Sequence, residues 1–447
     1  MRRPELLRRH TDDREILRLA LPAFGALVAE PLYVLVDTAI VGHLGTRPLG
    51  GLAIAGTVLV SAFGIFNFLA YGTTAAVARR VGAGDERAAA EHGVAGLWLA
   101  LGLGLALTLS ALVFAPLIVD AMGASTGVRP YALTYLRIGA LGAPAMLLSL
   151  AATGYLRGML DTRTPLVIAV TANVVNLVLE VVFVYMFHFG IAGSAWGTVI
   201  AQVGAAAAYL YIVGRAVRRA HASARPNRQY IHDAAVVGGH LVVRTGSLLA
   251  VFLATTAIAS RIGDTEVAAH QIAWQLWYFL ALALDALAIA AQAIVGRNLG
   301  ATDAEGTRRS SRRMLEWGVV AGCGAALFII AFLALLARIF THDPAVQSEL
   351  RHVLWAVALM QPIAALVFVL DGILIGAGDS RYLAVAMCGA ALAFVPAALL
   401  VLVTGSGLLA LWGALYVFVI GRLVGMYARY RGDHWLVTGA VRSSPRV

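Results

Sequence analysis

Twelve long apolar stretches divide this sequence, and each is long enough to cross a lipid bilayer. A helix needs about 20 mostly apolar residues to span a hydrocarbon core about 30 Å thick. With 60% hydrophobic and only 13% charged residues, the chain has too much apolar surface to bury inside a water-soluble globule. We therefore expect an all-α polytopic membrane protein. Its twelve predicted transmembrane helices occupy residues 16–42, 50–77, 92–119, 131–156, 165–187, 191–214, 234–260, 267–295, 314–337, 350–375, 382–404 and 408–428.

The distribution of arginine supports this count and orients the chain. Arginines gather in the two tails and in the even-numbered loops, as at Arg79 and Arg80. The odd-numbered loops carry isolated arginines only, which are Arg47, Arg129, Arg261 and Arg338. Because cytoplasmic loops are enriched in basic residues, we expect both termini to lie in the cytoplasm and the helices to cross an inner or plasma membrane.

The same basic residues argue against a nucleic-acid partner. The net charge is +10, but nucleic-acid binding requires basic residues gathered on one folded soluble face. Here they lie in short segments between apolar runs. The two cysteines, Cys323 and Cys388, fall inside predicted spans, so we expect neither a disulfide framework nor a metal cluster. The sequence shows no nucleophile–base or metal-ligand set, and we expect no enzymatic activity and no cofactor.

An internal repeat relates the two halves of the chain. The segment Arg79–Asp85 returns as Arg297–Asp303, and at the same offset Gly158 returns as Gly376. Both copies of the first segment end in an aspartate, which is suited to cap the helix that follows. The repeat therefore predicts that the two halves share one helical architecture.

Six predicted spans separate the two copies, so both halves have the same orientation in the membrane. This arrangement predicts two six-helix bundles related by a pseudo-two-fold axis along the membrane normal, with a central cleft between them. We assign residues 1–217 to an N-terminal six-helix bundle, residues 218–233 to a cytoplasmic linker and residues 234–447 to a C-terminal six-helix bundle.

Acidic side chains inside the predicted spans require an explanation. A charged residue at the bilayer centre costs roughly 2.5–3.5 kcal/mol on insertion scales. Asp37 lies deep in the first span, and Glu30 precedes it by two helical turns on the same face. The fifth span carries Asn173, Asn176 and Glu180 at spacings of three and four, which form a single polar stripe. We predict that these five residues form a cation or proton site inside the membrane.

The repeat indicates that this polar stripe belongs to the first half alone. The residues Asp37, Asn173, Asn176, Glu180, Thr198 and Gln202 correspond in the second half to Thr255, Ala391, Phe394, Ala398, Ala414 and Phe418. Residues needed only for packing should tend to keep their polarity in the other copy. The difference favours a functional cation site over a structural hydrogen-bond network, which remains the alternative.

A substrate cavity is predicted from further polar and aromatic residues in both halves. Asp285 lies deep in the eighth span, which also carries Trp274, and such a mixture can bind an organic cation through charge and cation–π contact. Helical packing is the alternative for the aromatic residues. Asp371 is either a cavity acid or an interhelical partner for Arg244 or Arg351. The predicted cavity residues are Tyr33, Asn67, Thr198, Gln202, Asp285, Gln271, Trp274 and Asp371.

Several segments resemble the DinF-like branch of the multidrug and toxic compound extrusion (MATE) family. The segment Asp37–Gly45 is similar to that branch's first-helix signature, and Arg157-Gly158 with Asp161-Thr162 is similar to its fourth-helix ending. Asp371-Gly372, followed by Gly376–Asp379, is also DinF-like. The resemblance covers nearly the whole chain and implies a transporter that expels a small molecule while a cation returns, without ATP. The sequence accordingly contains no GxxxxGK[ST] phosphate loop.

The resemblance also implies a role for two acids, because the family's proton-linked residues correspond to Asp37 and Glu180. The family more often has aspartate at the second position. Two neighbouring carboxyl groups away from water share a proton readily, and their titration belongs to the pair. Pro22 and Pro31 each remove a backbone hydrogen bond, which makes the first helix a bending element.

We therefore hypothesise that an ionised chamber accepts a cationic or amphiphilic substrate and that protonation from outside expels it. A Na⁺-coupled exporter of the same family is an alternative. A lipid-linked saccharide flippase is another, although it would need a strongly cationic cleft and most arginines lie in cytoplasmic loops. The expected partners are a small molecule, the coupling ion (H⁺ or Na⁺) and membrane lipid, with no nucleic acid, and we expect a monomer.

Overall fold

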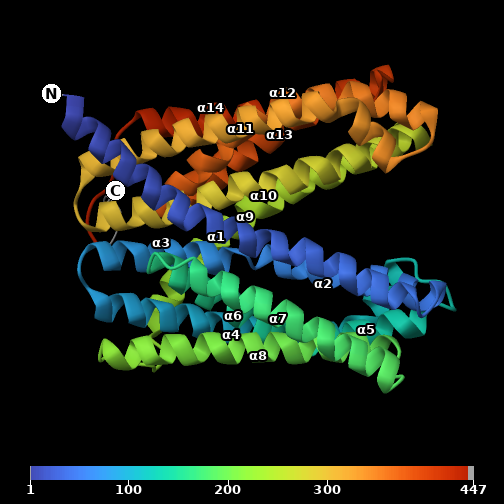
Figure 1. Cartoon of the computed structure of the whole chain (residues 1–447), viewed down its shortest axis with the longest axis horizontal. Coiled ribbons are helices and arrows are strands. Elements are labelled where there is room, and N and C mark those ends of the chain that lie inside the picture. Colours follow the sequence, from blue (N-terminus) through green and yellow to red (C-terminus); the bar gives the residue numbers. More distant parts are fainter. Residues whose placement is uncertain (1, 441–447) are drawn as a thin grey trace. The chain divides into compact units, whose positions relative to one another are not determined.

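The computed structural model describes residues 2–440, with side chains from residue 12 onward, and every regular element in that range is helical (Figure 1). Helices are expected because the hydrocarbon core offers no water to the backbone, so each span must pair its own N–H and C=O groups. The elements are α1 (Arg2–Gly42), α2 (Thr46–Ile65), α3 (Phe68–Gly82), α4 (Glu86–Ala121), α5 (Arg129–Leu141), α6 (Ala143–Gly158), α7 (Arg163–Val181), the π-helical turn η1 (Val182–Met186), α8 (Ile191–Arg219), α9 (Arg228–Ile262), α10 (Asp264–Gly300), α11 (Ala304–Phe340), α12 (Pro344–Gly376), α13 (Ser380–Thr404) and α14 (Gly407–Arg431).

The prediction of twelve transmembrane helices is confirmed. Eleven candidate spans are long and apolar enough within the described residues, and the bent pair α5–α6 makes a twelfth. That pair bends by 47° at Gly142. Another span is interrupted at Phe66–Asn67, between α2 and α3. Hydropathy does not reveal either break, because the apolar run continues through both.

Two helices begin at the aspartates that the repeat indicated as caps. The side chain of Asp85 accepts a hydrogen bond from the backbone N–H of Ala88 at 2.8 Å. In the second half, Asp303 accepts one from the backbone N–H of Gly306 at 2.7 Å. A side chain in this position satisfies one of the free N–H groups at a helix start. The expected capping role of both aspartates is confirmed.

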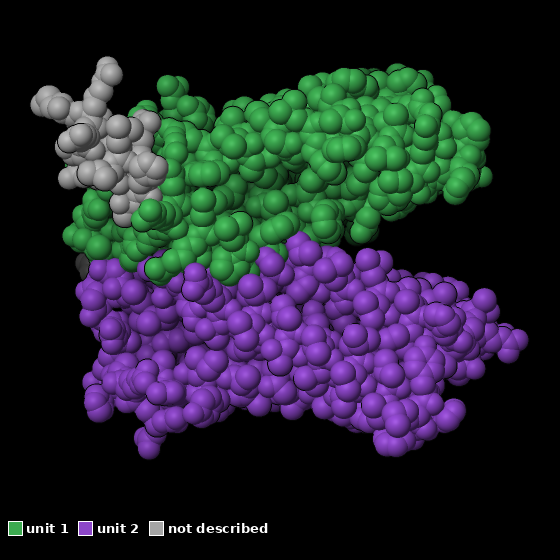
Figure 2. Space-filling model, viewed as in Figure 1, with its two compact units in different colours: residues 1–24, 239–447 green, residues 25–238 purple. Residues whose placement is uncertain are grey.

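The helices form two compact units, which Figure 2 colours separately. The first unit in chain order comprises residues 25–238 and is labelled unit 2 in Figure 2; the second unit comprises residues 1–24 together with 239–447 and is labelled unit 1 there. Within the first unit α4, α6 and α8 lie side by side, and within the second α10, α11 and α12 do so (Figure 1). The division from sequence had placed residues 1–24 in the N-terminal bundle. The non-helical connector between α8 and α9 is also shorter than the assigned linker.

Charge pairing explains why the start of α1 groups with the second unit. Asp13 accepts hydrogen bonds from Arg313, at 2.6 Å to Oδ1 and 2.9 Å to Oδ2, and a further bond from Trp317 Nε1 at 2.8 Å. Two helical positions later, Glu15 forms a bidentate pair with Arg297. Charge-assisted bidentate bonds of this kind are among the strongest side-chain interactions. They hold the part of α1 around Asp13 and Glu15 against the end of α10 and the N-terminal part of α11.

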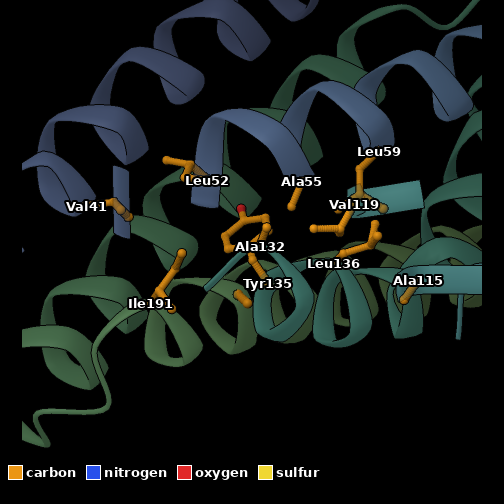
Figure 3. Packing of buried hydrophobic residues seen from close by; sticks show 11 residues of the cluster. Val41, Leu52, Ala55, Leu59, Ala115, Val119, Ala132, Tyr135, Leu136 and Ile191 are labelled. Atoms are coloured by element: carbon orange, nitrogen blue, oxygen red, sulfur yellow. The ribbon is translucent and has the colours of Figure 1, made fainter. Parts of the chain in front are cut away.

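An apolar core in the first unit holds one tyrosine whose hydroxyl group reaches a polar partner. Tyr135 of α5 is 6% exposed and belongs to a cluster contributed by α1, α2, α4, α5 and α8 (Figure 3). The cluster consists of Val41, Leu52, Ala55, Leu59, Ala115, Val119, Ala132, Tyr135, Leu136, Ile191 and Ala195. Dense packing of this kind restricts the ring to one position. The hydroxyl of Tyr135 is therefore a fixed donor.

We expect the substitution Asp13→Asn to loosen the N-terminal part of α1. An amide cannot accept the charge-assisted bonds of the carboxylate, each of which contributes about 1.5–3 kcal/mol. Amide hydrogen exchange of the protein in nanodiscs should become faster over residues 12–24 and stay unchanged over residues 163–181. The control is Asp264→Asn, which neutralises an exposed acid in the first turn of α10. Unchanged exchange over residues 12–24 would show that apolar contacts alone hold this segment.

Candidate functional site

Asp37 of α1 is the centre of a buried polar cluster in the first unit. Its side chain is 5% exposed, and both carboxyl oxygens accept hydrogen bonds. Ser194 of α8 donates to Oδ1 at 2.7 Å, and Tyr135 of α5 donates to Oδ2 at 3.4 Å. Hydrogen bonds to a charged group offset part of the cost of removing it from water. The two hydroxyl donors therefore suit an ionised aspartate.

Glu180 of α7 has a different environment, although it lies beside the same cluster. It is 0% exposed and close enough to Asp37 and Ser194 to interact with both. Neither of its carboxyl oxygens has hydrogen-bond geometry with any side chain or backbone group that the structure describes. The π-helical turn η1 begins two residues after it, and such turns are frequent at functional sites. Glu180 is thus a buried acid without a donor.

Close packing of α8 against α7 sets this geometry. Gly193 and Gly197 are four residues apart and flank Ser194, so they form the small-xxx-small pattern that lets two helices approach closely. A Cβ atom at Gly193 would lie 3.0 Å from the backbone carbon of Phe183, and one at Gly197 would lie 3.3 Å from the backbone nitrogen of Glu180. The two glycines therefore bring Ser194 to the acidic pair.

Further polar residues connect α1, α7 and α8 around the two acids. The hydroxyl groups of Tyr33 and Thr198 are 2.9 Å apart, and Thr198 also donates to the backbone oxygen of Ser194 at 3.1 Å. Tyr33 interacts in addition with the buried Asn176, one turn before Glu180. The amide of Asn173 donates to the backbone oxygen of Ala29 at 2.9 Å. The predicted residues Tyr33, Asp37, Asn176, Glu180 and Thr198 thus come together where α1, α7 and α8 meet, whereas Asn173 joins α7 to α1 at Ala29, eight residues before Asp37.

Three other predicted residues of the first unit lie outside this cluster. Glu30 is exposed. It lies two turns before Asp37, a rise of about 10 Å along the helix, and is therefore outside the cluster. Asn67 is exposed at the break between α2 and α3. Gln202 is half-buried and packs over Gly142, at the bend between α5 and α6.

The predicted residues of the second half lie in the other unit. Asp371 of α12 is buried in a bidentate ion pair with Arg244 of α9, which confirms its interpretation as an interhelical partner. Trp274 packs against Phe252, with ring centroids 4.4 Å apart, and against Trp277 at 5.0 Å. Asp285 is half-buried and Gln271 is exposed, both on α10.

Sequence reasoning missed two members of the cluster, Ser194 and Tyr135. Serine and tyrosine are common in membrane helices, so neither attracts notice alone. The repeat could have identified both, since the matching positions in the second half are Ala410 and Val353. The hydroxyl groups are absent there, as are the matching carboxyl groups.

Comparisons with known proteins identify the family. The MatE family model matches residues 22–182 and 246–400. The chain is 33% identical to Protein DETOXIFICATION 44, chloroplastic, of Arabidopsis thaliana, covering 92% of this chain and 80% of that protein. It is 30% identical to DNA damage-inducible protein F of Escherichia coli, covering 95% of this chain and 93% of that protein. The chain belongs to the MATE family. As a MATE protein it is a small-molecule efflux transporter of the membrane and not an enzyme.

Solved MATE structures share the fold of this MATE transporter. A crystal structure of MATE in the bent conformation matches with a TM-score of 0.85 and 23% identity, covering 94% of this chain and 95% of that chain. A structure in the straight conformation matches with a TM-score of 0.83 and 24% identity, covering 94% and 96%. The resemblance to the MATE family and its DinF-like branch, inferred from short motifs, is confirmed.

We expect Gly197→Val to impair this MATE transporter by pushing α8 away from α7. The added side chain would displace Ser194 and Thr198 from the acids, and overpacking of this kind costs about 1–3 kcal/mol. The matched control is Gly204→Val on the same helix, where a Cβ atom meets nothing within 4 Å. Thermal unfolding in detergent should show a lower midpoint for Gly197→Val alone, with loss of substrate efflux. Equal effects of both substitutions would contradict the close-packing account.

Proposed function

We propose that this MATE transporter exports cationic or amphiphilic small molecules in exchange for protons, and that Asp37 and Glu180 carry the coupling. The observation that supports this proposal most directly is the burial of Glu180 next to Asp37 without a hydrogen-bond donor among the described residues. An ionised carboxylate in that position would be costly. Binding a proton removes the charge and the cost together.

The two states of the acidic pair favour different ligands. With Glu180 protonated, the cluster carries one negative charge, on Asp37. Without that proton it carries two charges that repel each other in surroundings of low polarity. A positively charged cargo relieves this repulsion, and so does a proton. Cargo and proton therefore compete for one site, which is the requirement for exchange.

Two relatives named as multidrug resistance proteins support the export of varied small molecules. The chain is 28% identical to Multidrug resistance protein PmpM of Pseudomonas aeruginosa, over 84% of this chain and 80% of that protein. It is 26% identical to Probable multidrug resistance protein NorM of Geobacillus kaustophilus, over 75% of this chain and 76% of that protein. We extend the multidrug character to this chain as part of the proposal.

Helix α1 is the element through which protonation would act. It carries Tyr33 and Asp37 of the cluster and contains two prolines, Pro22 and Pro31. Each proline leaves one backbone carbonyl of the helix without its N–H partner, which weakens the helix locally. A changed charge at Asp37 and Glu180 can thus alter the course of α1 at low cost. With both termini in the cytoplasm, as the arginine distribution favours, protonation would occur from the outer side.

We expect both Asp37→Asn and Glu180→Gln to abolish proton-driven transport. The assay is transport of ethidium, a cationic dye, in proteoliposomes under an imposed pH gradient. Both variants should fall to the level of protein-free liposomes, because Glu180→Gln removes the exchangeable proton and Asp37→Asn removes a negative charge that attracts the cationic cargo. Glu305→Gln, which neutralises an exposed acid in the first turn of α11, is the control and should retain full transport. Full transport by Asp37→Asn would refute the proposal.

Na⁺-coupled export is the second candidate function. Both Glu180 oxygens and Oδ1 of Asn176 accept no hydrogen bond within the described part of the chain, and hard cations prefer oxygen ligands. A Na⁺ gradient imposed at equal pH on both sides separates the two candidates. Transport under the Na⁺ gradient alone would support Na⁺ coupling, and transport under the pH gradient alone would support proton coupling.

A further inference from the structure

The hydrogen atoms of the cluster's hydroxyl groups can be assigned one by one. Each hydroxyl group has a single hydrogen to donate. Ser194 and Tyr135 direct theirs to Asp37. Thr198 directs its hydrogen to the backbone oxygen of Ser194. Since that hydrogen is used, the contact of 2.9 Å between Tyr33 and Thr198 requires Tyr33 to be the donor.

This assignment leaves the two acids unequal. Asp37 receives two hydroxyl hydrogens, whereas Glu180 receives none from the hydroxyl groups around it. Donors stabilise a carboxylate and not a neutral carboxylic acid. The arrangement therefore matches a state in which Asp37 is ionised and Glu180 carries the proton.

Ser194 is one of the two residues whose hydroxyl hydrogen goes to Asp37 and not to Glu180. It is 0% exposed and lies within interaction distance of both acids, and its hydroxyl hydrogen points to Asp37. Its backbone is held in place, because Gly193 packs against Phe183 of η1 and Gly197 packs against Glu180 of α7. Rotation about its Cα–Cβ bond is the remaining freedom.

We propose that Ser194 is a positioning residue that keeps Asp37 ionised and thereby assigns the exchangeable proton to Glu180. The inference rests on the proposed proton coupling at this pair. When Glu180 releases its proton to water, its O–H bond breaks and the electron pair remains on the carboxylate. The Ser194 hydroxyl then rotates from Asp37 to Glu180 and donates its single hydrogen to the newly ionised carboxylate. Asp37 thus remains ionised, and Glu180 binds and releases the proton.

No other charged group surrounds Glu180 among the described residues that interact with it. The titratable groups that face it are Asp37 and Tyr33 from α1 and Tyr135 from α5. Helix α8 contributes the neutral Ser194, and its own helix contributes the neutral Asn176. The exchange of one proton between Glu180 and water is therefore governed by Asp37 and by the hydroxyl groups.

Infrared spectroscopy of the full chain in nanodiscs tests where the proton lies. A protonated carboxylic acid has a C=O stretch that a carboxylate lacks. At neutral pH we expect this band to be lost in Glu180→Gln and retained in Asp37→Asn. Labelling all aspartates with ¹³C at the carboxyl carbon should leave the band in place, because it belongs to a glutamate. Loss of the band in Asp37→Asn, or its displacement by the aspartate label, would overturn the inference.

Ser194→Ala tests the positioning role through the pH profile of ethidium transport. Without its donor the ionised pair is less stable, so the pH of half-maximal transport should rise by about one unit. Tyr135→Phe, which removes a longer hydrogen bond, should cause a smaller rise. Ser194→Thr, which restores a hydroxyl group, should return the profile toward that of the unaltered protein. A merely structural role for Ser194 would lower the rate at every pH without moving the profile, and that result would overturn the inference.

Two features keep this test apart from the test of proton coupling. The infrared band reports which acid carries the proton, whichever ion drives transport. The assignment of the proton to Glu180 can therefore fail while proton coupling holds, and proton coupling can fail while the assignment holds. Ser149→Ala is the matched control, since it removes a hydroxyl group of α6 that donates within its own helix. Its pH profile should equal that of the unaltered protein. An equal shift in Ser149→Ala would assign the effect of Ser194→Ala to altered packing and would overturn the inference.

Discussion

The burial of two neighbouring carboxyl groups is the constraint on which the first unit depends. Two negative charges this far from water would repel each other strongly, and each would lack the solvent that normally stabilises it. The unit meets this constraint at Asp37 with two hydroxyl donors and leaves Glu180 with none. In the proposed function this pair holds one proton, and a cationic cargo replaces that proton when it is released.

Helix α1 connects the acidic cluster to the second unit. Asp13 and Glu15 of this helix are ion-paired with α11 and α10, while its later turns contribute Tyr33 and Asp37 to the acidic cluster. The boundary between the two compact units falls at residues 24 and 25, shortly after Pro22. A single continuous helix therefore belongs to both units, and Pro22 removes one of its backbone hydrogen bonds near the boundary. Asp37 is therefore joined to the second unit through the backbone of one helix.

Much of the architecture and part of the site could be predicted from the sequence. Apolar runs and arginine placement are sufficient for twelve spans, because the bilayer imposes length and polarity on every segment. Spacings of three and four brought Asn173, Asn176 and Glu180 onto one face, and the structure places Asn176 and Glu180 in the cluster with Asp37, while Asn173 bonds the backbone of Ala29 about two turns away. The same reasoning does not place Glu30 in the cluster. It shares a helical face with Asp37 but lies two turns away, at a different depth. Ser194 and Tyr135 required knowledge of which helices touch, which periodicity within one helix does not contain. The grouping of residues 1–24 depends likewise on long-range ion pairs.

The central claim is that cargo and one proton compete for the buried pair of Asp37 and Glu180. The most direct measurement is proton release from the purified transporter in weakly buffered detergent solution, followed with a pH indicator as ethidium is added. The account predicts that ethidium binding releases protons from the unaltered protein and none from Glu180→Gln. Ethidium binding without proton release, or equal release from Glu180→Gln, would contradict it.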